Sequence, residues 1–447
     1  IGEAVIDEDN FDITLFFPAG GDLTSLTPAI EVSRAATVVP ESGEVQNFSP
    51  DAVYTVTAQD GVTTQDWTVS AIIQRPFITS WNSLGGDLTI SINEGEDYDF
   101  NFIWKNSNGQ IVSFGRHNSD EDFITNLPAG EFTLEIIGTF PHFTGYPKDQ
   151  LLDVNQWGDI IWVSMRESFR NWTGIDFSAS DTPDLSQRPD MFRAFSDNPN
   201  FNADLSDWDM SQIRTLQGLF NTCPSFNSDI SNWNVSNVTN MESTFLGSGF
   251  NGDISEWNVS NVTRMVNTFR DATNFDQDIS GWDFSNVSNM SNMLSNSDMS
   301  VQHYDKFLIS LATQDVRNDV TLGASGLNSC LSSDAKDQLI DVNDWTIQDN
   351  GQQCSSETDI VAFDIPGSQI GDAVIDTANH TAVSIVLNSA DLSALAPEIT
   401  TSADASLIPA SGIVQDFTNP VIYEVIASDS TSQTWTVTVT NSENASD

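Results

Sequence analysis

The feature that most constrains this fold is an internal repeat of about 25 residues in the middle of the chain. The equivalent positions are Trp157, Pro183, Trp208, Trp233, Trp257 and Trp282. Each is followed after eight residues by Met or Leu, and four residues later by Phe or Leu, as in FNSDISNWNVSNVTNMESTF. One such unit cannot bury its apolar side alone, whereas stacked units share a continuous core. The repeat therefore predicts a solenoid of about six turns, each with a short strand and a short helical turn.

The two ends of the chain form a second kind of repeat. IGEAVID at 1–7 returns as IGDAVID at 370–376, and Trp67 matches Trp435. Large and small residues alternate at period two within each copy, which predicts a small Ig-like β-sandwich. The second copy is preceded by a predicted first strand, DIVAFDIPGSQ at 359–369, which has no counterpart before Ile1. The missing strand would come from upstream in a longer tandem array or from a neighbouring chain; otherwise the first module is incomplete.

Between these repeats, residues 75–148 predict another Ig- or PKD-like sandwich. Strands are expected at 87–92, 98–105, 110–115 and 130–138, with turns at 106–109 and 128–130. The whole chain is therefore expected to be mainly β and multidomain. Its expected domains are 1–74, an Ig-like sandwich lacking its first strand; 75–148, the second sandwich; 149–355, the solenoid with a C-terminal cap; and 356–447, a second Ig-like sandwich.

Charge and motifs exclude several classes of function. The net charge of −49 opposes binding to nucleic acid or to an anionic membrane surface, and it suits an extracellular, cell-surface protein. No apolar run is long enough to enter a membrane as a helix. The four histidines are scattered, no Cys pair has CxxC spacing, and neither GxSxG nor a phosphate-binding loop occurs. We therefore expect no enzyme and no cofactor, with Ca²⁺ as a candidate structural ion.

The candidate binding residues lie within the repeats. Every basic residue between 166 and 270 is an arginine. The candidates are Arg166, Arg170, Arg193, Arg214, Arg264 and Arg270, together with Trp172, which lies outside the strict repeat. The arginines either pair with neighbouring acids or form a face that recognises an acidic glycan or a protein carboxylate. Trp172 either packs in the core or stacks on a sugar.

One acidic position recurs in successive turns. It is occupied by Asp204, Asp229, Asp253 and Asp278. Each carboxylate either accepts hydrogen bonds from backbone N–H groups of its own turn or contributes to a cation-binding ladder. Beyond the repeat, residues 300–314 and 332–340 predict two cap helices, with Cys330 and Cys354 flanking the second. We expect these cysteines to form a disulfide that closes a loop of ~25 residues and contributes ~3 kcal/mol.

The repeat FNSDISNWNVSNVTNMESTF and its sister turns resemble the BspA-like leucine-rich surface proteins, in the branch with Trp-Asn-Val-Ser-Asn-Val-Thr-Asn-Met repeats. The resemblance covers roughly residues 76–355. The terminal modules resemble the Ig-like or cadherin-like domains of large Bacteroidota adhesins. In gliding bacteria of that phylum, adhesins of this general kind are exported by type IX secretion. The resemblance implies cell-surface adhesion to a protein or glycan ligand, with neighbouring modules or subunits at the N-terminal module.

These observations lead to two hypotheses about function. The first is a non-enzymatic surface adhesin or filament segment, with the solenoid as its interaction face and the Ig-like modules as spacers or linkers. The second is a carbohydrate-binding protein of an extracellular polysaccharide-utilisation system.

Overall fold

The computed structural model describes residues 4–17, 21–92, 96–119, 121–143, 149–172, 174 and 177–442. It confirms that the chain is mainly β and built from several sheets. The chain divides into two compact units, one made of residues 1–253 and 257–262 and the other of 254–256 and 263–447. Neither helix of the described residues has the length and hydropathy of a membrane span.

The N-terminal module is a five-stranded sheet. Its strands are β1 (Val5–Asp7), β2 (Asp12–Phe17), β3 (Thr37–Val39), β4 (Ala52–Thr57) and β5 (Thr64–Ile73), in the order β1-β2-β5-β4-β3. Strands β2 and β5 run parallel, and the other neighbours are antiparallel. The alternating apolar residues pack under one face, where Phe48, Tyr54 and Val69 are buried. This core is small for a module of about 75 residues.

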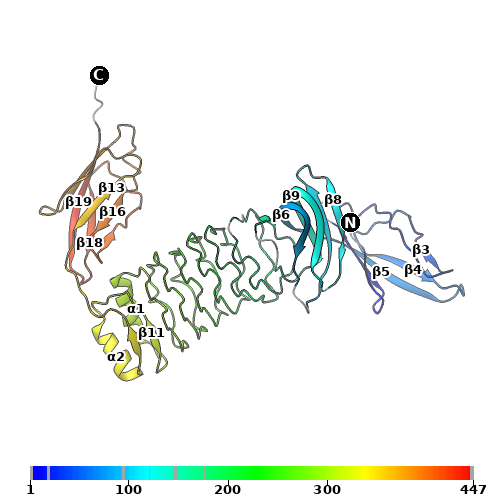
Figure 1. Ribbon diagram of the computed structural model, residues 1–447, viewed down its shortest axis with the longest axis horizontal. Helices are drawn as coiled ribbons and strands as arrows, with labels where there is room; N and C mark the ends of the chain where they lie inside the picture. Colours follow the sequence, from blue (N-terminus) through cyan, green and yellow to red (C-terminus); the bar gives the residue numbers. More distant parts are fainter. Residues whose placement is uncertain are drawn as a thin grey trace, which may run out of the picture. The chain divides into compact units, whose positions relative to one another are not determined.

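The C-terminal module repeats this sheet and adds a second one. The main sheet contains β14 (Val374–Asp376), β15 (Thr381–Val386), β17 (Ser406–Ile408), β18 (Val421–Ile426) and β19 (Ser432–Asn441), in the order β14-β15-β19-β18-β17. Across the core, β13 (Ile360–Asp364) pairs antiparallel with β16 (Glu398–Thr401), as Figure 1 shows. Ile360, Phe363 and Ile365 from the β13 segment are buried in a core of 13 residues. The predicted first strand at 359–369 is therefore the element that closes this core.

The second predicted sandwich, at residues 75–148, is one antiparallel sheet in the described residues and not the two facing sheets that the sequence predicts. Its strands are β6 (Phe77–Ile90), β7 (Asp99–Asn106), β8 (Ile111–His117), β9 (Phe123–Thr139) and β10 (Leu151–Gln156), in the order β10-β6-β9-β7-β8. The turn expected at 128–130 is absent because β9 continues through it, paired on both sides of it with the long strand β6. Strand β10 lies beyond residue 148, so the sheet crosses the predicted domain boundary.

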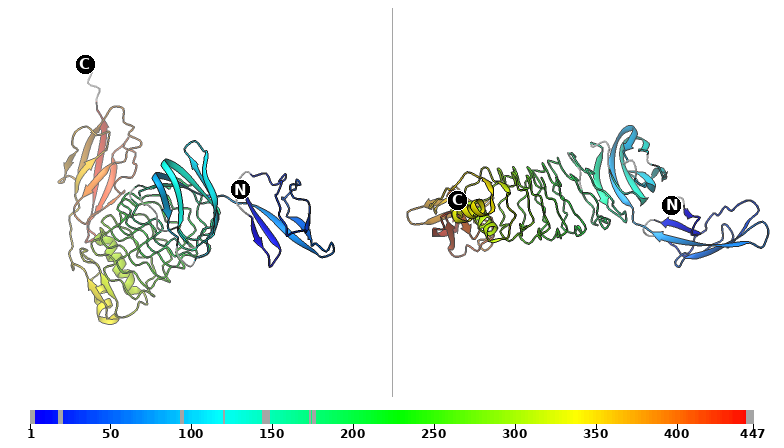
Figure 2. Two further views of the ribbon diagram at one scale, coloured as in Figure 1. Left: turned by 45° about the vertical axis from the view of Figure 1, so that its right-hand side comes forward. Right: turned by 90° about the horizontal axis from the view of Figure 1, so that it is seen from below.

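The repeats form stacked turns, but these turns contain neither strands nor helices. Between residues 157 and 300 the described chain consists of hydrogen-bonded turns joined by isolated parallel bridges. Figures 1 and 2 show the turns of residues 157–262 lying one beside the next. At least two described residues of each turn have positive φ, such as Ser243 at 57° and Gly247 at 62°. Because such residues interrupt an extended backbone, the short strands and helical turns predicted for each repeat do not form.

Alternate N–H groups hold neighbouring turns together. Leu216, Gly218, Phe220 and Thr222 each donate to a carbonyl of the next turn, while N–H groups between them bond within the turn. Phenylalanines stack in the same register: the rings of Phe195 and Phe220 are 5.9 Å apart and nearly parallel. The backbone hydrogen bonds and the ring stacking between neighbouring turns therefore both recur once per repeat. The predicted leucine-rich-repeat solenoid is not what the structure shows.

The C-terminal cap of the repeats contains two helices and a short parallel sheet. Helices α1 (Val301–Thr313) and α2 (Ser333–Asn343) alternate with β11 (Thr321–Gly323) and β12 (Thr346–Gln348). Cys330 and Cys354 form a disulfide. The buried carboxylate of Asp305 accepts hydrogen bonds from the N–H groups of Cys330 and Leu331 and from the Ser332 hydroxyl. These bonds fix the loop that leads into α2.

Candidate functional site

An irregular turn creates a pocket near the start of the stack. Pro183 occupies the position at which four later turns carry a tryptophan. Trp233, Trp257 and Trp282 each donate their indole N–H to a backbone carbonyl of the preceding turn, at 2.9 to 3.2 Å. The corresponding acceptor for Trp208 would be the carbonyl of Ser180, but none of the described residues accepts a hydrogen bond from Trp208 Nε1. Trp208 as a whole residue is only 6% exposed.

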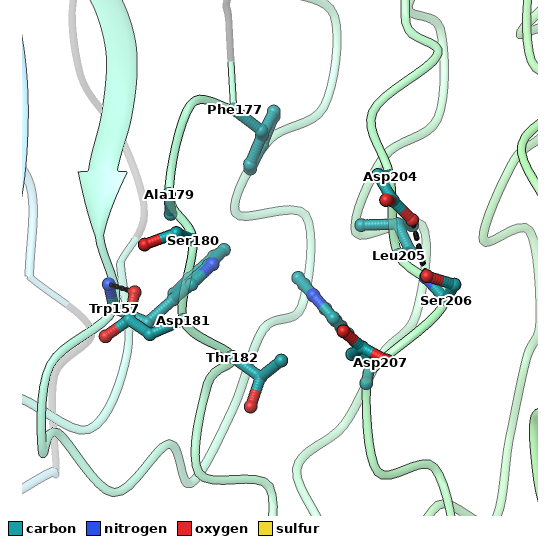
Figure 3. A pocket seen from close by; sticks show the side chains of 11 residues that line it. Trp157, Phe177, Ala179, Ser180, Asp181, Thr182, Asp204, Leu205, Ser206 and Asp207 are labelled. Carbon is teal, nitrogen blue, oxygen red and sulfur yellow. Dashed lines mark hydrogen bonds between the residues drawn. The ribbon is translucent and has the colours of Figure 1, made fainter.

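The pocket has a volume of about 130 Å³. Figure 3 shows the segment from Phe177 to Thr182 on one side and residues 204–207 on the other. Trp157 and Trp208 also line it, with their ring centroids 5.2 Å apart and nearly perpendicular. Typical small-molecule pockets have volumes of ~300–1,000 Å³. This pocket therefore fits one edge of a polar ring and does not enclose a whole ligand.

The acidic side chains of the pocket have different roles. Asp181 accepts hydrogen bonds from the N–H groups of Trp157 and Gly158, both at 2.9 Å, and from Arg75 at 3.3 Å. Asp204 accepts from the hydroxyl and N–H of Ser206, and the hydroxyl bond lowers the pKa of Asp204 more than the backbone bond does. Asp207 is exposed and has no hydrogen-bond or ion-pair partner among the described residues. Asp207 is therefore the carboxylate available to a ligand.

A donor and an acceptor thus line the same small pocket. The indole N–H of Trp208 can donate to a hydroxyl oxygen, and Asp207 can accept from a hydroxyl group. Aromatic surface with a few polar groups suits the apolar face and hydroxyl edge of a sugar. The sequence does not predict a ligand-binding role for Trp208 or Asp207, although Pro183 already marks the turn as irregular.

The predicted arginine face is spread over several turns and partly engaged in ion pairs. Arg166 lies 3.0 Å from Asp190, with its guanidinium carbon 4.2 Å from the centroid of the Phe192 ring. The guanidinium carbon of Arg193 lies 5.1 Å from the centroid of the same ring. Arg170 pairs with Glu167 and Asp197. The ion pairs hold Arg166 and Arg170, and Phe192 brings Arg166 and Arg193 together.

The remaining arginine candidates are separate from this cluster. The carbonyl of Arg214 accepts from the N–H of Thr239 in the next turn. Arg264 forms a parallel bridge with Asn289, and Arg270 pairs with the adjacent Asp271 at 3.2 Å. A role of these arginines in recognition therefore stays a prediction.

Trp172 is in the core, which corrects the hypothesis that its ring stacks on a sugar. It is 2% exposed and packs edge-to-face against Phe143 and Phe169. Its backbone N–H donates to the side chain of Asn198. A ring enclosed in this way cannot present a face to a ligand from solvent.

Asp204, Asp229 and Asp278 of the aspartate column accept hydrogen bonds from groups of the protein itself. Asp229 accepts from the N–H of Ser231, and Asp278 accepts from Ser280 and from Lys306 at 3.0 Å. Burial raises the pKa of Asp278, but the hydrogen bonds from Ser280 and Lys306 outweigh it and bring the pKa down to about 2. No group of three or more potential metal ligands occurs in the part of the chain that the structure describes. Asp253, the fourth member, also has an interaction partner.

The comparisons with known proteins match the two kinds of repeat separately. The family model described as SGBP, N-terminal, matches residues 1–71 and again residues 360–439. The family model described as a Mycoplasma protein of unknown function, DUF285, matches residues 163–249 and 246–319. No curated protein matches the chain. Each family model covers less than half of the sequence.

Two solved structures of Bacteroides proteins align with parts of the chain. A candidate glycoside hydrolase from Bacteroides thetaiotaomicron is 33% identical over 20% of this chain and 27% of its own, with a TM-score of 0.19. A candidate secreted protein from Bacteroides fragilis is 20% identical over 20% of this chain and 98% of its own, with a TM-score of 0.17. The chain thus spans about a quarter of the first of these proteins.

These matches correct the resemblance drawn from the repeat sequence. The assignment to the BspA-like leucine-rich proteins is wrong: the middle segment matches DUF285, and the ends match the SGBP N-terminal model. The structural reason is that the repeat buries Trp, Phe and Met on turns with positive φ, without the strand that defines each leucine-rich unit.

Proposed function

We propose that this protein is a surface glycan-binding protein of the extracellular or cell-surface compartment. The observation that carries the proposal is the match of the SGBP N-terminal family model at both ends of the chain. This match favours carbohydrate binding over the adhesin or filament hypothesis. A net charge of −49 agrees with a location outside the cell.

The pocket between Trp157 and Trp208 is the site at which we propose that sugar binds. Its free donor is the Trp208 indole N–H, and its free acceptor is the Asp207 carboxylate. The acidic rim, which also includes Asp181 and Asp204, would repel uronic acids and sulfated sugars. The proposed ligand is therefore a neutral polysaccharide, bound through one edge of a sugar unit.

We also propose that the protein binds its glycan without cleaving it. Glycoside hydrolysis by the common mechanism needs a carboxylic acid with a raised pKa beside a second carboxylate. In this pocket the pKa of Asp204 is lowered by hydrogen bonds from Ser206, and Asp181 is engaged with backbone N–H groups. These contacts support binding and oppose general acid catalysis.

The test is affinity electrophoresis and calorimetry of the 447-residue protein with soluble neutral and acidic polysaccharides. We expect saturable binding to a neutral polymer, no release of reducing ends, and a loss of at least tenfold in affinity for Asp207→Asn and Trp208→Phe. Asp229→Asn, in the same column as Asp204 but outside the pocket, should leave affinity unchanged.

The possible outcomes test the proposed function and the proposed binding site separately. Absence of binding to every polysaccharide, neutral or acidic, would refute glycan binding, and binding to acidic polymers alone would refute the neutral ligand. Binding that is unchanged in both pocket variants would keep the function and refute the pocket. Release of reducing ends would refute the non-enzymatic proposal.

A further inference from the structure

One wall of the proposed sugar pocket, residues 177–182, breaks the pattern of hydrogen bonds between neighbouring turns. In the regular stack the side chain of Asn202 accepts a hydrogen bond from the N–H of Asn227 in the next turn, at 2.8 Å. The wall has Ser178 at the position where these turns carry asparagine. Within the described residues, no hydrogen bond joins the wall to residues 201–208. The pocket is therefore a place where two neighbouring turns are not bonded to each other.

The wall is bonded instead to the second sheet. The N–H of Ser178 donates to one carboxylate oxygen of Asp153 at 2.9 Å, and the Ser178 hydroxyl donates to the other oxygen. The N–H of Ala179 donates to the carbonyl of Val154 at 3.0 Å. Asp153 and Val154 both lie on β10. Strand β10 therefore supplies the hydrogen-bond partners that a neighbouring turn supplies elsewhere in the stack.

The Asp153 carboxylate is itself fixed by the sheet. The side-chain amide of Asn155 donates to Asp153 at 2.7 Å, and the hydroxyl of Ser80 donates to Asn155 at 2.7 Å. Ser80 lies on β6, which pairs with β10. A side chain that is held by further hydrogen bonds on rigid elements can orient the groups bound to it. Asp153 can therefore determine where Ser178 lies.

The other end of the wall is attached to the segment that follows β10. Asp181 accepts hydrogen bonds from the N–H groups of Trp157 and Gly158, both at 2.9 Å, as Figure 3 shows for Trp157. The guanidinium of Arg75, just before β6, lies 3.3 Å from the same carboxylate. Both ends of the wall are thus bonded to the second sheet and its flanking residues.

This attachment explains why the pocket is open. In later turns the tryptophan indole N–H reaches a carbonyl of the preceding turn, whereas Trp208 has no acceptor among the described residues. The wall is bonded to β10 on one side, and the Ser180 carbonyl does not reach Trp208 on the other. Asp153 and Ser178 do not line the pocket. Any effect of these two residues on a bound sugar must therefore act through the wall.

We propose that Asp153 and Asp181 are positioning residues of the sugar site. They hold the wall against the second sheet and so keep the pocket open between two turns, with the Trp208 indole N–H available to a ligand. The proposal rests on the proposed function, because it assigns these residues to the same glycan pocket. A pocket whose polar groups are already in position loses less free energy in ordering when the sugar binds.

The test measures affinity by calorimetry with soluble β-glucan, xyloglucan, galactomannan and starch, using the full chain and the polymer that binds most tightly. We expect Asp153→Ala to bind at least tenfold more weakly. Ser178→Ala, which keeps its backbone hydrogen bond, should show a smaller loss. Asp153→Asn keeps one acceptor oxygen and should recover part of the affinity. In the ligand-free Asp153→Ala protein, the amide of Ser178 should exchange at least tenfold faster.

The matched control is Asn227→Ala. Asn227 accepts a hydrogen bond from the N–H of Asn251 in the next turn, at 2.7 Å, and lies outside the pocket. This variant should leave affinity unchanged even if it lowers Tm. An equal loss of affinity in Asn227→Ala and Asp153→Ala would reflect general destabilisation and would overturn the positioning role.

The remaining outcomes distinguish the positioning role from the proposed function. Unchanged affinity in Asp153→Ala, with affinity lost in Trp208→Phe, would overturn the positioning role and keep the sugar site. If Asp153→Ala does not fold, Ser178→Ala decides, and unchanged affinity in that variant would overturn the proposal. Failure of the unmodified protein to bind any of the four polymers would count against the sugar site, and the positioning role would fall with it.

Discussion

Trp233 and Trp208 occupy equivalent positions in successive turns but differ in one hydrogen bond. Trp233 Nε1 donates to the carbonyl of Leu205 at 2.9 Å, and Leu205 is buried. Replacing Trp233 with Phe removes the donor and leaves a buried carbonyl without it, which costs ~1–3 kcal/mol. Trp208 has no such acceptor, so Trp208→Phe loses only ring contacts, a loss that Trp233→Phe shares.

The expected difference between the two variants is therefore about 1–3 kcal/mol, with Trp233→Phe the less stable. For a cooperative unit of 150–250 residues this corresponds to roughly 2–4 °C in Tm for each kcal/mol. Differential scanning calorimetry of both variants in the full chain measures it. Equal Tm values, or a lower Tm for Trp208→Phe, would refute the conclusion that the Trp208 indole N–H is free.

Four further perturbations test other parts of the structure. Phe226→Ala removes a fully buried ring and should lower stability by ~3–5 kcal/mol, whereas Phe114→Ala, at a side chain 73% exposed, should change it by less than about 0.5 kcal/mol in urea unfolding. Replacing Cys330 and Cys354 with Ser removes the disulfide between two cysteines that are 24 residues apart in the sequence, and it should lower the stability of the cap by ~3 kcal/mol. An unchanged calorimetric unfolding transition would contradict this. The pKa of Asp278 is lowered from 3.8 to about 2, so its stabilisation is complete above pH 4 and declines as the pH falls towards 2; because its side chain is 37% exposed, we expect only ~1 kcal/mol, absent in Asp278→Asn. Addition of EDTA should leave Tm unchanged, because the column aspartates Asp204, Asp229 and Asp278 accept hydrogen bonds from groups of the protein itself. A fall in Tm would instead support the hypothesis of a cation-binding ladder.

Much of the organisation could be predicted from periodicity because periodicity reflects repeated burial. The spacing of Trp and Phe defined the stacked turns, since residues at one repeat position must meet the same neighbours. The alternating pattern of the terminal copies likewise predicted β strands, and the segment at 359–369 contains the expected strand over Ile360–Asp364. In each case the signal is local in sequence or repeats at a fixed interval.

The conformation within each turn was not accessible in this way. The pattern of Met241 and Phe245 suggested a short helix, and the residues before each Trp suggested a strand. Pairs of positive-φ residues instead produce turns that bond to their neighbours through alternate N–H groups. Ser and Asn at these positions are compatible with several conformations, so tertiary stacking selects the one observed.

The sequence by itself determined the repeats, the mainly β class and the acidic surface, because these follow from composition and spacing. Only the tertiary structure decided which similar residues differ in environment. It buried Trp172, left the Trp208 indole N–H without an acceptor among the described residues where Pro183 breaks the tryptophan series, and left Trp67 only half-buried where its counterpart Trp435 is fully buried. The physical reason is that burial and hydrogen-bond satisfaction depend on the neighbouring turn or strand, which a residue's own sequence context does not specify.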